Sequence, residues 1–467
     1  MIKRKTSATL LLINEIDNIF YSFYTNLFMI MRIFYIFYIF ISETIKFKTK
    51  NLTNTLIYRV PKLERLTLIK SITHKLEELN IVYLKIFQSL CLEKNILHQD
   101  EKDYLLKYTD NVPYKSQEID YEILDILEKE YNIKLEESQP INSGIIGIVF
   151  KGLDVSNNNS KVIIKLLKKD IEEKLNTVFN EIECLSYIIS FIPFLNNINL
   201  RKLFLDNKEC LLNQVNFVKE VTNIEIFKFK NKNLPEYRIP YVYKEITNNY
   251  NNVIVMENIK GLTIDDIEKL DTTIKEEFAK LFQKFGFISI LYNSAIHNDL
   301  HSGNVFFYIN NINSGLPKYQ LGLIDFGICC FPNKNNQNSY YYFFNEFFIN
   351  KKFDNLDKID ELSSVIIEEK YELNKLKNNN NEKYRSLRNE KIKILKKYSE
   401  IEISCNFLFD LAILLKKNNF NISKEFNEIC LGLKTVENVI LTLSPENKKI
   451  QNKVMLELNQ SNKLLEI

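Results

Sequence analysis

Two short segments decide the fold of this chain: HNDLHSGN at residues 297–304 and LIDFG at residues 323–327. Asp299 and Asn304 are five residues apart, and Asp325 follows an apolar run that is typical of a strand. An Asp that orients an acceptor hydroxyl, with an Asn and a second Asp that hold magnesium, is the set that phosphoryl transfer requires. The pair of segments at this separation therefore predicts a site for a nucleotide phosphate chain and its magnesium ion.

The composition is that of a globular protein with room for two or three domains. The chain has 467 residues, of which 45% are hydrophobic and 26% are charged. Its formal net charge of +3 is too small to indicate binding to nucleic acid or steering of acidic partners. We therefore expect no nucleic-acid partner.

Cysteine usage indicates an intracellular, reducing compartment. The seven cysteines form no CxxC motif and no His/Cys cluster, although Cys329 and Cys330 are adjacent. This pattern favours free thiols over a disulfide framework or a zinc site. With only 10 glycines in the chain, each one is expected to hold a backbone position that needs it.

The first domain, residues 1–50, contains a long aromatic and aliphatic run at residues 19–41. The run is long enough to span a bilayer, and the cost of its central Arg32, about 2.5–3.5 kcal/mol, can be offset by the surrounding apolar residues. A membrane helix, a buried aromatic helix and an unpacked leader all fit this segment. A cleaved presequence is disfavoured, because Glu15 and Asp17 interrupt the basic character.

Residues 51–135 are expected to form a helical extension that precedes the nucleotide site. Apolar residues recur at helical spacing in several segments, and the second of these carries Lys85 and Gln88. The expected helices are residues 64–80, 82–92, 101–108 and 121–131.

Two strands with a glycine-containing turn follow, at residues 145–149 and 162–166. Gly144 and Gly147 would let backbone amides approach phosphate oxygens. Lys165 ends the second strand, where a lysine can hold phosphates and pair with a helix glutamate. Both assignments depend on the downstream magnesium motifs, because a strand turn with glycines and a strand lysine are each common.

The next segments supply candidates for the partner of Lys165 and for the hinge. The run VIVME at residues 253–257 is expected to be a buried strand that leads into a hinge, with Glu257 beside the cofactor. Three glutamates on the intervening helices are candidate partners of Lys165: Glu181, Glu183 and Glu220.

The remainder, residues 261–467, is expected to be a larger helical lobe. No Ala-Pro-Glu motif and no evident phosphorylatable activation loop follow residue 330. Residues 368–400 are rich in charge and contain an asparagine run, which favours a solvated helix–loop insertion. Apolar helical spacing returns at residues 406–415 and 425–443 and closes the lobe.

The order of these motifs resembles the UbiB family, the AarF-type atypical kinase-like proteins. Members carry a KxGQ helix, and YLKIFQ at residues 83–88 matches its Lys85 and Gln88, with Phe87 in place of the glycine. The family's Asp-x-Val-Pro corresponds to DNVP at residues 110–113. Ordinary kinases have nothing comparable upstream of the nucleotide site.

Three further segments carry the resemblance. In QVNFVKEVTN at residues 214–223, Glu220 and Asn223 match the family, while Gln214 and Asn216 replace two carboxylates. The family's HADPHPGN and Asp-Phe-Gly correspond to the two segments quoted first. The closing helix of the family resembles VENVILTLSPE at residues 436–446.

The resemblance implies an α+β, bilobal protein-kinase-like fold with ATP and Mg2+ as cofactors. The N-lobe, residues 136–260, would be small and contain the strands, and the N-terminal helical extension would carry the KxGQ-like motif. In the family's roles, Asp299 and Lys165 are catalytic, and Asn304 and Asp325 hold the metal. The residues expected on the nucleotide side are Gly144, Gly147, Lys165, Glu220, Glu257, Lys85 and Gln88.

One departure from the family bears on mechanism. The family has an alanine-rich loop followed by Gln, which is thought to disfavour ordinary protein phosphorylation. This chain has Gly144, Ile145 and Ile148 at the corresponding positions. The loop is thus closer to that of an ordinary kinase, and the inhibitory contacts of the extension are expected to differ.

Three functions remain as alternatives at this point. The first is a UbiB-like kinase or ATPase, which would work on a lipid or isoprenoid quinone at a membrane if the family's role carries over. The second is a small-molecule phosphotransferase of the aminoglycoside or choline type, which uses the same HxDxxxxN pattern. The third is a nucleotide-binding pseudokinase scaffold. Acceptor and oligomeric state are left open.

Overall fold

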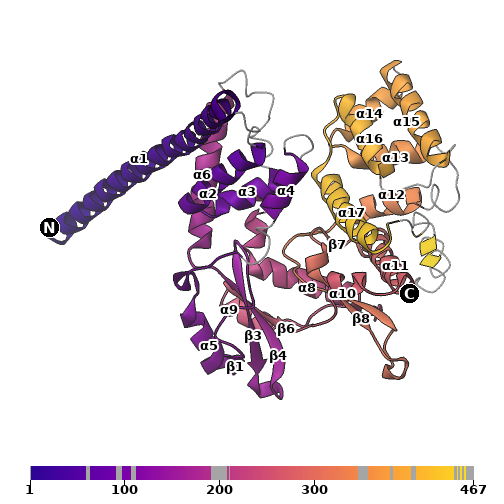
Figure 1. Ribbon diagram of the computed structural model, residues 1–467, viewed down its shortest axis with the longest axis horizontal. Coiled ribbons are helices and arrows are strands. Elements are labelled where there is room, and N and C mark those ends of the chain that lie inside the picture. The colour runs from indigo at the N-terminus through magenta and orange to yellow at the C-terminus, as the bar shows by residue number, and fades with distance from the viewer. Residues whose placement is uncertain are drawn as a thin grey trace. The chain divides into compact units, whose positions relative to one another are not determined.

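A computed structural model provides the structure of the protein (Figure 1). It describes residues 2–58, 64–90, 97–106, 112–190, 208–209, 211–344, 356–378, 382–400 and 406–445, and residues 450, 453–454 and 457–458. The expectations that rest on Asp110, on residues 379–381 of the asparagine run and on Glu446 lie outside these residues.

The chain forms two compact units. The first unit consists of residues 1–158 and 165–215, and the second of residues 159–164 and 216–467. The lobe boundaries expected from the sequence refer to kinase lobes and not to compact units, and they stay predictions.

The first unit begins with helices, as the apolar spacing predicts. Their boundaries agree with the expected ones to within a few residues, and α1 is longer than the apolar run that it contains. The helices are α1 (Ile2–Thr53), which is followed by the π-turn η1 (Asn54–Tyr58), α2 (Arg65–Leu79), α3 (Val82–Leu90), α4 (Gln99–Leu106), α5 (Tyr121–Tyr131) and α6 (Ile171–Ser190).

The sheet of the first unit is built around β3 (Gly147–Asp154), whose residues alternate between half-buried and buried along the strand. β1 (Ile133–Leu135) and β2 (Asn142–Ser143) both pair with β3 in antiparallel register. β4 (Ser160–Leu167) follows, and the boundary between the units divides it. In the first unit the Lys168 amide donates to the Ile146 carbonyl at 2.9 Å, which holds the end of β4 beside the glycine turn.

The second unit contains two small sheets. Parallel and antiparallel pairing join three strands in the order β5-β9-β8, and β10 pairs with β7 in antiparallel register. The strands are β5 (Tyr237–Arg238), β6 (Val253–Glu257), β7 (Ile296–His297), β8 (Val305–Ile309), β9 (Tyr319–Leu323) and β10 (Cys329–Cys330).

Helices cover these strands and build the core of the second unit (Figure 1). The core is rich in phenylalanine: Phe278, Phe282 and Phe307 are fully buried, and the Phe278 and Phe307 rings meet edge to face with centroids 5.0 Å apart. The helices are α8 (Phe217–Lys230), α9 (Lys244–Asn249), α10 (Ile264–Glu268), α11 (Thr272–Ile288), α12 (Lys334–Phe344), α13 (Leu356–Ile366), α14 (Lys370–Asn378), α15 (Glu382–Glu400), α16 (Asn406–Lys417) and α17 (Lys424–Leu443).

The charged segment at residues 368–400 is more ordered than a solvated helix–loop insertion. It contains α14 and α15, and each helix buries apolar residues on one side, such as Leu373 and Leu387. Most of its charges are exposed, as expected, but the Lys391 side chain is only 1% exposed. The departure comes from tertiary pairing, because the partner of Lys391 is on α13, outside the segment.

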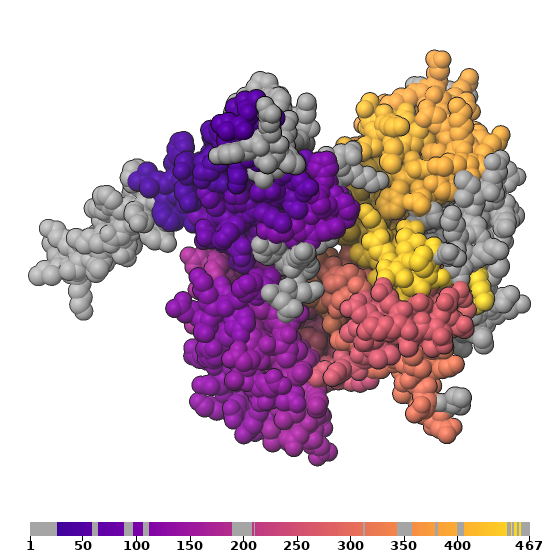
Figure 2. All heavy atoms as spheres, viewed as in Figure 1, coloured from indigo at the N-terminus to yellow at the C-terminus, as the bar shows by residue number. Residues whose placement is uncertain are grey.

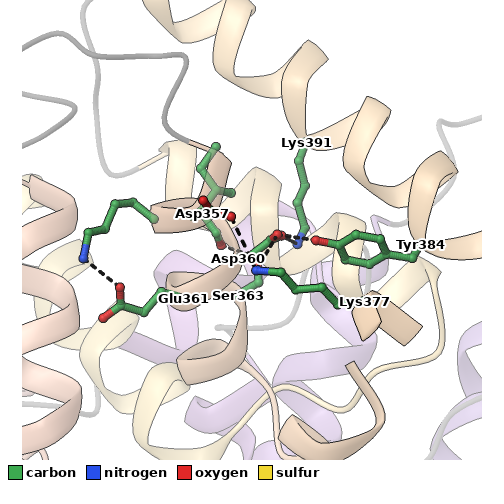
Figure 3. Close-up of polar contacts among 9 residues, drawn as sticks. Asp357, Asp360, Glu361, Ser363, Lys377, Tyr384 and Lys391 are labelled. Carbon is green, nitrogen blue, oxygen red and sulfur yellow. Dashed lines mark hydrogen bonds and ion pairs between the residues drawn. The ribbon is translucent and has the colours of Figure 1, made fainter. Parts of the chain in front are cut away.

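That partner is Asp360, at the centre of a polar cluster (Figure 3). Lys391 Nζ donates to Asp360 Oδ1 at 2.9 Å, the Tyr384 hydroxyl donates to Oδ2, and Lys377 Nζ lies 3.5 Å from Oδ2. Although burial alone would raise it, the pKa of Asp360 is lowered by Lys391 and Tyr384. The cluster ties α14 and α15 to α13.

This geometry predicts an asymmetric response to mutation. Asp360→Asn leaves the buried Lys391 ammonium without its counter-ion, which should cost about 3–5 kcal/mol of unfolding free energy. Lys391→Met leaves Asp360 with Tyr384 and Lys377, and should cost about half as much or less. Urea denaturation of both variants measures the two losses of unfolding free energy. Equal losses would show that Lys391 does not depend on Asp360 more than Asp360 depends on Lys391.

Candidate functional site

His297 organises the loop that carries Asp299. It lies on β7 opposite Cys329 of β10 and is 1% exposed. The Asp299 amide donates to His297 Nδ1 at 3.2 Å, and His297 Nε2 lies 3.1 Å from the Ile324 carbonyl. Since Nδ1 accepts, the imidazole is neutral with its proton on Nε2. Burial lowers the pKa of His297, which agrees with this state.

Asn304 connects the two signature segments through both its backbone and its side chain. Its side-chain amide donates to the Asp299 carbonyl at 2.8 Å, and its own carbonyl accepts from the Ile324 amide at 3.0 Å. Asn304 is 7% exposed. The structure thus brings Asp299, Asn304 and the residue before Asp325 together, as the motif spacing predicts.

Asp325 has a left-handed backbone with φ of +59°, which non-glycine residues seldom adopt. Its Oδ1 accepts a long hydrogen bond from the Gly327 amide at 3.4 Å. A Cβ on Gly327 would lie 3.3 Å from Asp325 Oδ1 and 3.7 Å from Glu220 Oε2. The carboxylates of Asp325 and Glu220 therefore both lie beside Gly327.

Helix α8 brings Glu220 to this place and holds the Asp-Phe-Gly segment. The Asn223 side-chain amide donates to the Phe326 carbonyl at 2.8 Å, and Phe326 is fully buried against Phe227 and His297. Asn216, which replaces a carboxylate of the family pattern, caps the start of α8 by accepting from the Lys219 amide at 2.9 Å. Asn223 and Asn216 thus have structural roles that the motif match did not supply.

Acidic groups dominate the electrostatics of this region. The pKa of the Cys329 thiol is raised by burial and further by Glu220, Asp325 and Asp299. Three negative side chains that act on one buried thiol make a region that favours a cation. Cys329 itself is therefore a neutral thiol rather than a nucleophile.

Magnesium fits the residues present. The Asn304 side-chain nitrogen donates to the Asp299 carbonyl, so Asn304 Oδ1 is the side-chain atom left to bind a metal. An amide oxygen and the Asp325 carboxylate suit Mg2+, which keeps waters and phosphate oxygens in its remaining positions. Among the described residues, no three or more His, Cys, Asp or Glu side chains form a group that could hold a metal ion without such help.

Gly432 on α17 lets this helix approach β7 and the start of the loop that carries Asp299 closely. A Cβ at Gly432 would lie 2.3 Å from Ile296 Cγ2 and 2.8 Å from Asn298 Oδ1, on either side of His297. No sequence motif marks this glycine, but the scarcity of glycine in the chain is a signal that could have found it.

Gly432→Ala should therefore destabilise the protein. In an exposed helix this change is stabilising by roughly 0.5–1 kcal/mol, but overpacking against the loop should cost about 1–3 kcal/mol and lower turnover. Thermal unfolding and ATP turnover measure the effect. The control is Lys434→Ala, which changes an exposed residue of the same helix. If Gly432→Ala were as stable as this control, Gly432 would not be needed for packing of α17 on the loop.

Apart from Glu257, which lies in the second unit, the other expected site residues belong to the first unit. The Gly144 amide donates to the Gly147 carbonyl at 2.9 Å, which closes the turn, and a Cβ on Gly147 would lie 3.2 Å from the Leu166 carbonyl. Lys165 is half-buried on β4, between the buried Ile164 and Leu166. The glycine turn and the part of β4 that carries Lys165 therefore lie at the same end of the sheet, and phosphate binding by these residues stays a prediction.

The KxGQ-like helix lies against the glycine turn. Leu84, Val112 and Ile145 form one buried cluster, and the Val112 amide donates to the Ser143 carbonyl at 2.6 Å. Lys85 is half-buried, and Gln88 lies in the last turn of α3, where only the backbone is described. The extension is thus packed on the turn through Leu84, next to Lys85.

Glu181, a candidate partner of Lys165, has a different role. It is fully buried on α6 and accepts hydrogen bonds from Arg32 of α1 and from the Tyr83 hydroxyl of α3. Burial raises the pKa of Tyr83, and the Glu181 carboxylate raises it further. Glu181 therefore joins α1, α6 and the KxGQ-like helix. Its carboxylate is engaged by Arg32 and Tyr83, which gives it this structural role in place of the expected pairing with Lys165.

Glu257 ends β6, as expected, and is half-buried. It accepts from Arg238 Nη2 at 2.5 Å and from the Tyr241 amide at 3.2 Å. These bonds fix the chain where it leaves β6. A role for Glu257 beside the cofactor stays a prediction.

Comparison with known proteins supports what the geometry indicates. The family model described as the ABC1 atypical kinase-like domain matches residues 108–359, which include the glycine turn, Lys165, the catalytic loop and the Asp-Phe-Gly segment. The chain belongs to this family. Membership confirms the resemblance to UbiB and AarF proteins and the expected α+β, bilobal kinase-like fold with a helical N-terminal extension.

Individual relatives are distant. A probable protein kinase UbiB of Shewanella piezotolerans is 28% identical over 249 residues, which cover 50% of this chain and 43% of that protein. An uncharacterized protein from the hydrogenase 1 5′ region of Clostridium pasteurianum is 26% identical over 79% of this chain and 67% of its own length. The chain thus spans less than half the length of the UbiB relative it matches.

One solved structure with a similar backbone is the erythromycin complex of Rv3197 from Mycobacterium tuberculosis. It has a TM-score of 0.44 and 14% sequence identity, and the match covers 69% of this chain and 79% of that one. At this score the likeness has no bearing on the site.

Proposed function

We propose that the protein is a UbiB-like atypical kinase or ATPase that binds Mg2+ and ATP and transfers or hydrolyses the γ-phosphate. The observation that carries the proposal is the hydrogen-bonded set in the second unit. His297 holds Asp299 and Ile324, and Asn304 holds the same two residues through other atoms. Such rigid positioning is the main contribution of a protein to phosphoryl transfer.

In the proposed reaction, Asp299 accepts the proton of the acceptor hydroxyl or water. The acceptor oxygen forms a bond to the γ-phosphorus while the bond from that phosphorus to the bridging oxygen of ADP breaks. Asn304 and Asp325 hold magnesium, which supplies positive charge to the phosphate oxygens when bound. Lys165 binds phosphates, with Glu220 as its partner, and Gly144 and Gly147 offer backbone amides.

The remaining expected site residues have supporting roles in this proposal. Glu257 fixes the segment that follows β6 on the adenine side, and Lys85 and Gln88 contribute to nucleotide binding from the extension. The buried contact of Leu84 with Ile145 supports the last assignment, because it packs α3 on the glycine turn.

We further propose a membrane setting inside the cell, with a lipid or isoprenoid quinone as ligand. Residues Asn26–Ile57 form a helix that is long and apolar enough to cross a membrane by length and composition. The four cysteines in the described part of the chain, Cys184, Cys329, Cys330 and Cys430, are free thiols, which agrees with a reducing compartment.

The decisive experiment measures ATP turnover by the full chain with and without liposomes. A panel of amino alcohols and aminoglycosides tests the second functional class in parallel. We expect magnesium-dependent turnover that liposomes stimulate and the panel does not. Phosphorylation of a panel member would assign the small-molecule class, and nucleotide binding with no turnover under any condition would assign a scaffold.

A further inference from the structure

Helix α1 has two apolar faces, and only one of them is covered. Ile33, Ile36 and Ile39 are buried against the rest of the first unit. On the opposite face, six large apolar residues are between 46% and 70% exposed: Leu27, Met31, Phe34, Tyr38, Ile41 and Ile45. We call this set the apolar stripe.

The apolar stripe is continuous along the helix. Its members alternate in steps of four and three residues, so they lie one above the other on one side of α1. In Figure 2 the described part of α1 lies at the surface of its unit. A contiguous exposed row of this kind marks an interaction surface.

Polar contacts connect the covered face of α1 to helices α6 and α2 of the same unit. Near one end, Arg32 binds the buried Glu181 of α6. Near the other, the Glu43 carboxylate binds Lys75 Nζ and the Ser71 hydroxyl of α2, both at 2.6 Å. A helix that crossed a bilayer would have to break these contacts or carry α2 and α6 into hydrocarbon, where their charges are costly.

The charge around the stripe identifies its occupant. From residue 26 to residue 53, Glu43 is the only acidic residue, and Lys75 neutralises it on the covered face. Lys48 and Lys50 are exposed near the C-terminal end of the stripe, as is Lys46, which also pairs with Glu43 at 2.9 Å. Two copies of α1 paired along the stripe would bring lysines but no acidic partners, whereas an anionic lipid surface complements an apolar face flanked by lysines.

We propose that α1 lies parallel to the surface of an anionic bilayer, with the apolar stripe in the boundary between headgroups and acyl chains, while Arg32 and Glu43 keep it docked on the first unit. This inference deepens the proposed membrane setting and does not depend on the nucleotide chemistry. It replaces a spanning helix by a surface anchor whose orientation the unit itself fixes.

The absence of tryptophan from the chain provides a direct test. The single substitutions Leu27→Trp, Phe34→Trp and Ile41→Trp each place one reporter on the stripe of the full-length protein. The vesicles contain phosphatidylglycerol and lipids brominated at defined depths. A surface helix gives all three reporters the same shallow depth, and each emission shifts to the blue on binding.

A spanning helix gives a different pattern. Positions 27 and 41 are separated by roughly 21 Å along the axis, from 14 residues at about 1.5 Å each, so their depths would differ and bromines at the bilayer centre would quench one of the three best. That pattern would overturn the proposal, and so would the absence of quenching in all three. Phe229→Trp is the matched control, because Phe229 is 70% exposed, as is Phe34, but lies on α8.

Two further measurements separate the remaining outcomes. The double variant Phe34→Ser with Ile41→Ser should weaken vesicle co-sedimentation at least about tenfold and leave the ATP-induced thermal shift unchanged. If the unmodified protein shows no ATP-induced thermal shift but binds vesicles as expected, that result counts against the proposed function alone. Sedimentation of the lipid-free protein should show no dimer that depends on the stripe. A dimer that dissociates in the Phe34→Ser variant would instead show that the stripe binds a second copy of the chain.

Discussion

Asp325→Asn is expected to abolish magnesium-dependent ATP binding, whereas Asp299→Asn should preserve binding and lower turnover by about 10²–10⁴-fold. Asp299 belongs to the hydrogen-bonded set and Asp325 directly follows its member Ile324, and in the proposed reaction the two aspartates do different chemistry. Asp325 supplies a full negative charge to the metal, and an amide at this position is a weaker ligand without that charge. Asp299 acts on the acceptor, and its backbone amide keeps its bond to His297 in the variant.

The measurements are ATP-induced thermal shift with and without magnesium, and ATP turnover at saturating nucleotide. Asp170→Asn is a matched control for Asp325→Asn. Both aspartates have a left-handed backbone, with φ of +63° at Asp170 and +59° at Asp325, and Asp170 is exposed outside the site. Equal loss of turnover without loss of binding in both site variants would show that Asp325 does not hold the metal. Normal turnover in Asp299→Asn would remove it as the base.

Local sequence pattern was sufficient for most of the elements around this site. The apolar spacing of residues 121–131 predicted α5 at its observed boundaries, and β-branched runs predicted β4 and β6. The HxDxxxxN spacing predicted that Asp299 and Asn304 would act together, and one side-chain hydrogen bond joins them. These features are local because turn geometry and strand alternation depend on neighbouring residues.

Features that depend on distant pairs could not be predicted in this way. Arg32 and Glu181 are 149 residues apart, and neither has a neighbour that identifies the other. In the sequence, Arg32 is a cost to a membrane helix and Glu181 is a candidate partner of Lys165, because the sequence does not show that each is the counter-ion of the other. Lys391 was assigned to a solvated charge run for the same reason, since Asp360 lies outside that run.

The contact that Glu181 makes leads to an expected effect on stability as large as that of Asp360→Asn. Glu181→Gln should lower the unfolding free energy of the first unit by about 3–5 kcal/mol, because it leaves Arg32 without its counter-ion and weakens the acceptor of the Tyr83 hydroxyl. The Glu181 side chain is fully buried and that of Arg32 is 16% exposed, so little water can replace the lost charge.

Glu183→Gln is the matched control, since it makes the same change two residues along α6 at an exposed position. Its expected cost is about 0–1 kcal/mol in urea denaturation. Joint replacement by Arg32→Met and Glu181→Met should recover much of the loss, because an apolar pair leaves no buried charge. If Glu181 instead served Lys165, Glu181→Gln would raise the KM for ATP and match Glu183→Gln in stability; we expect the KM of the folded protein to be unchanged.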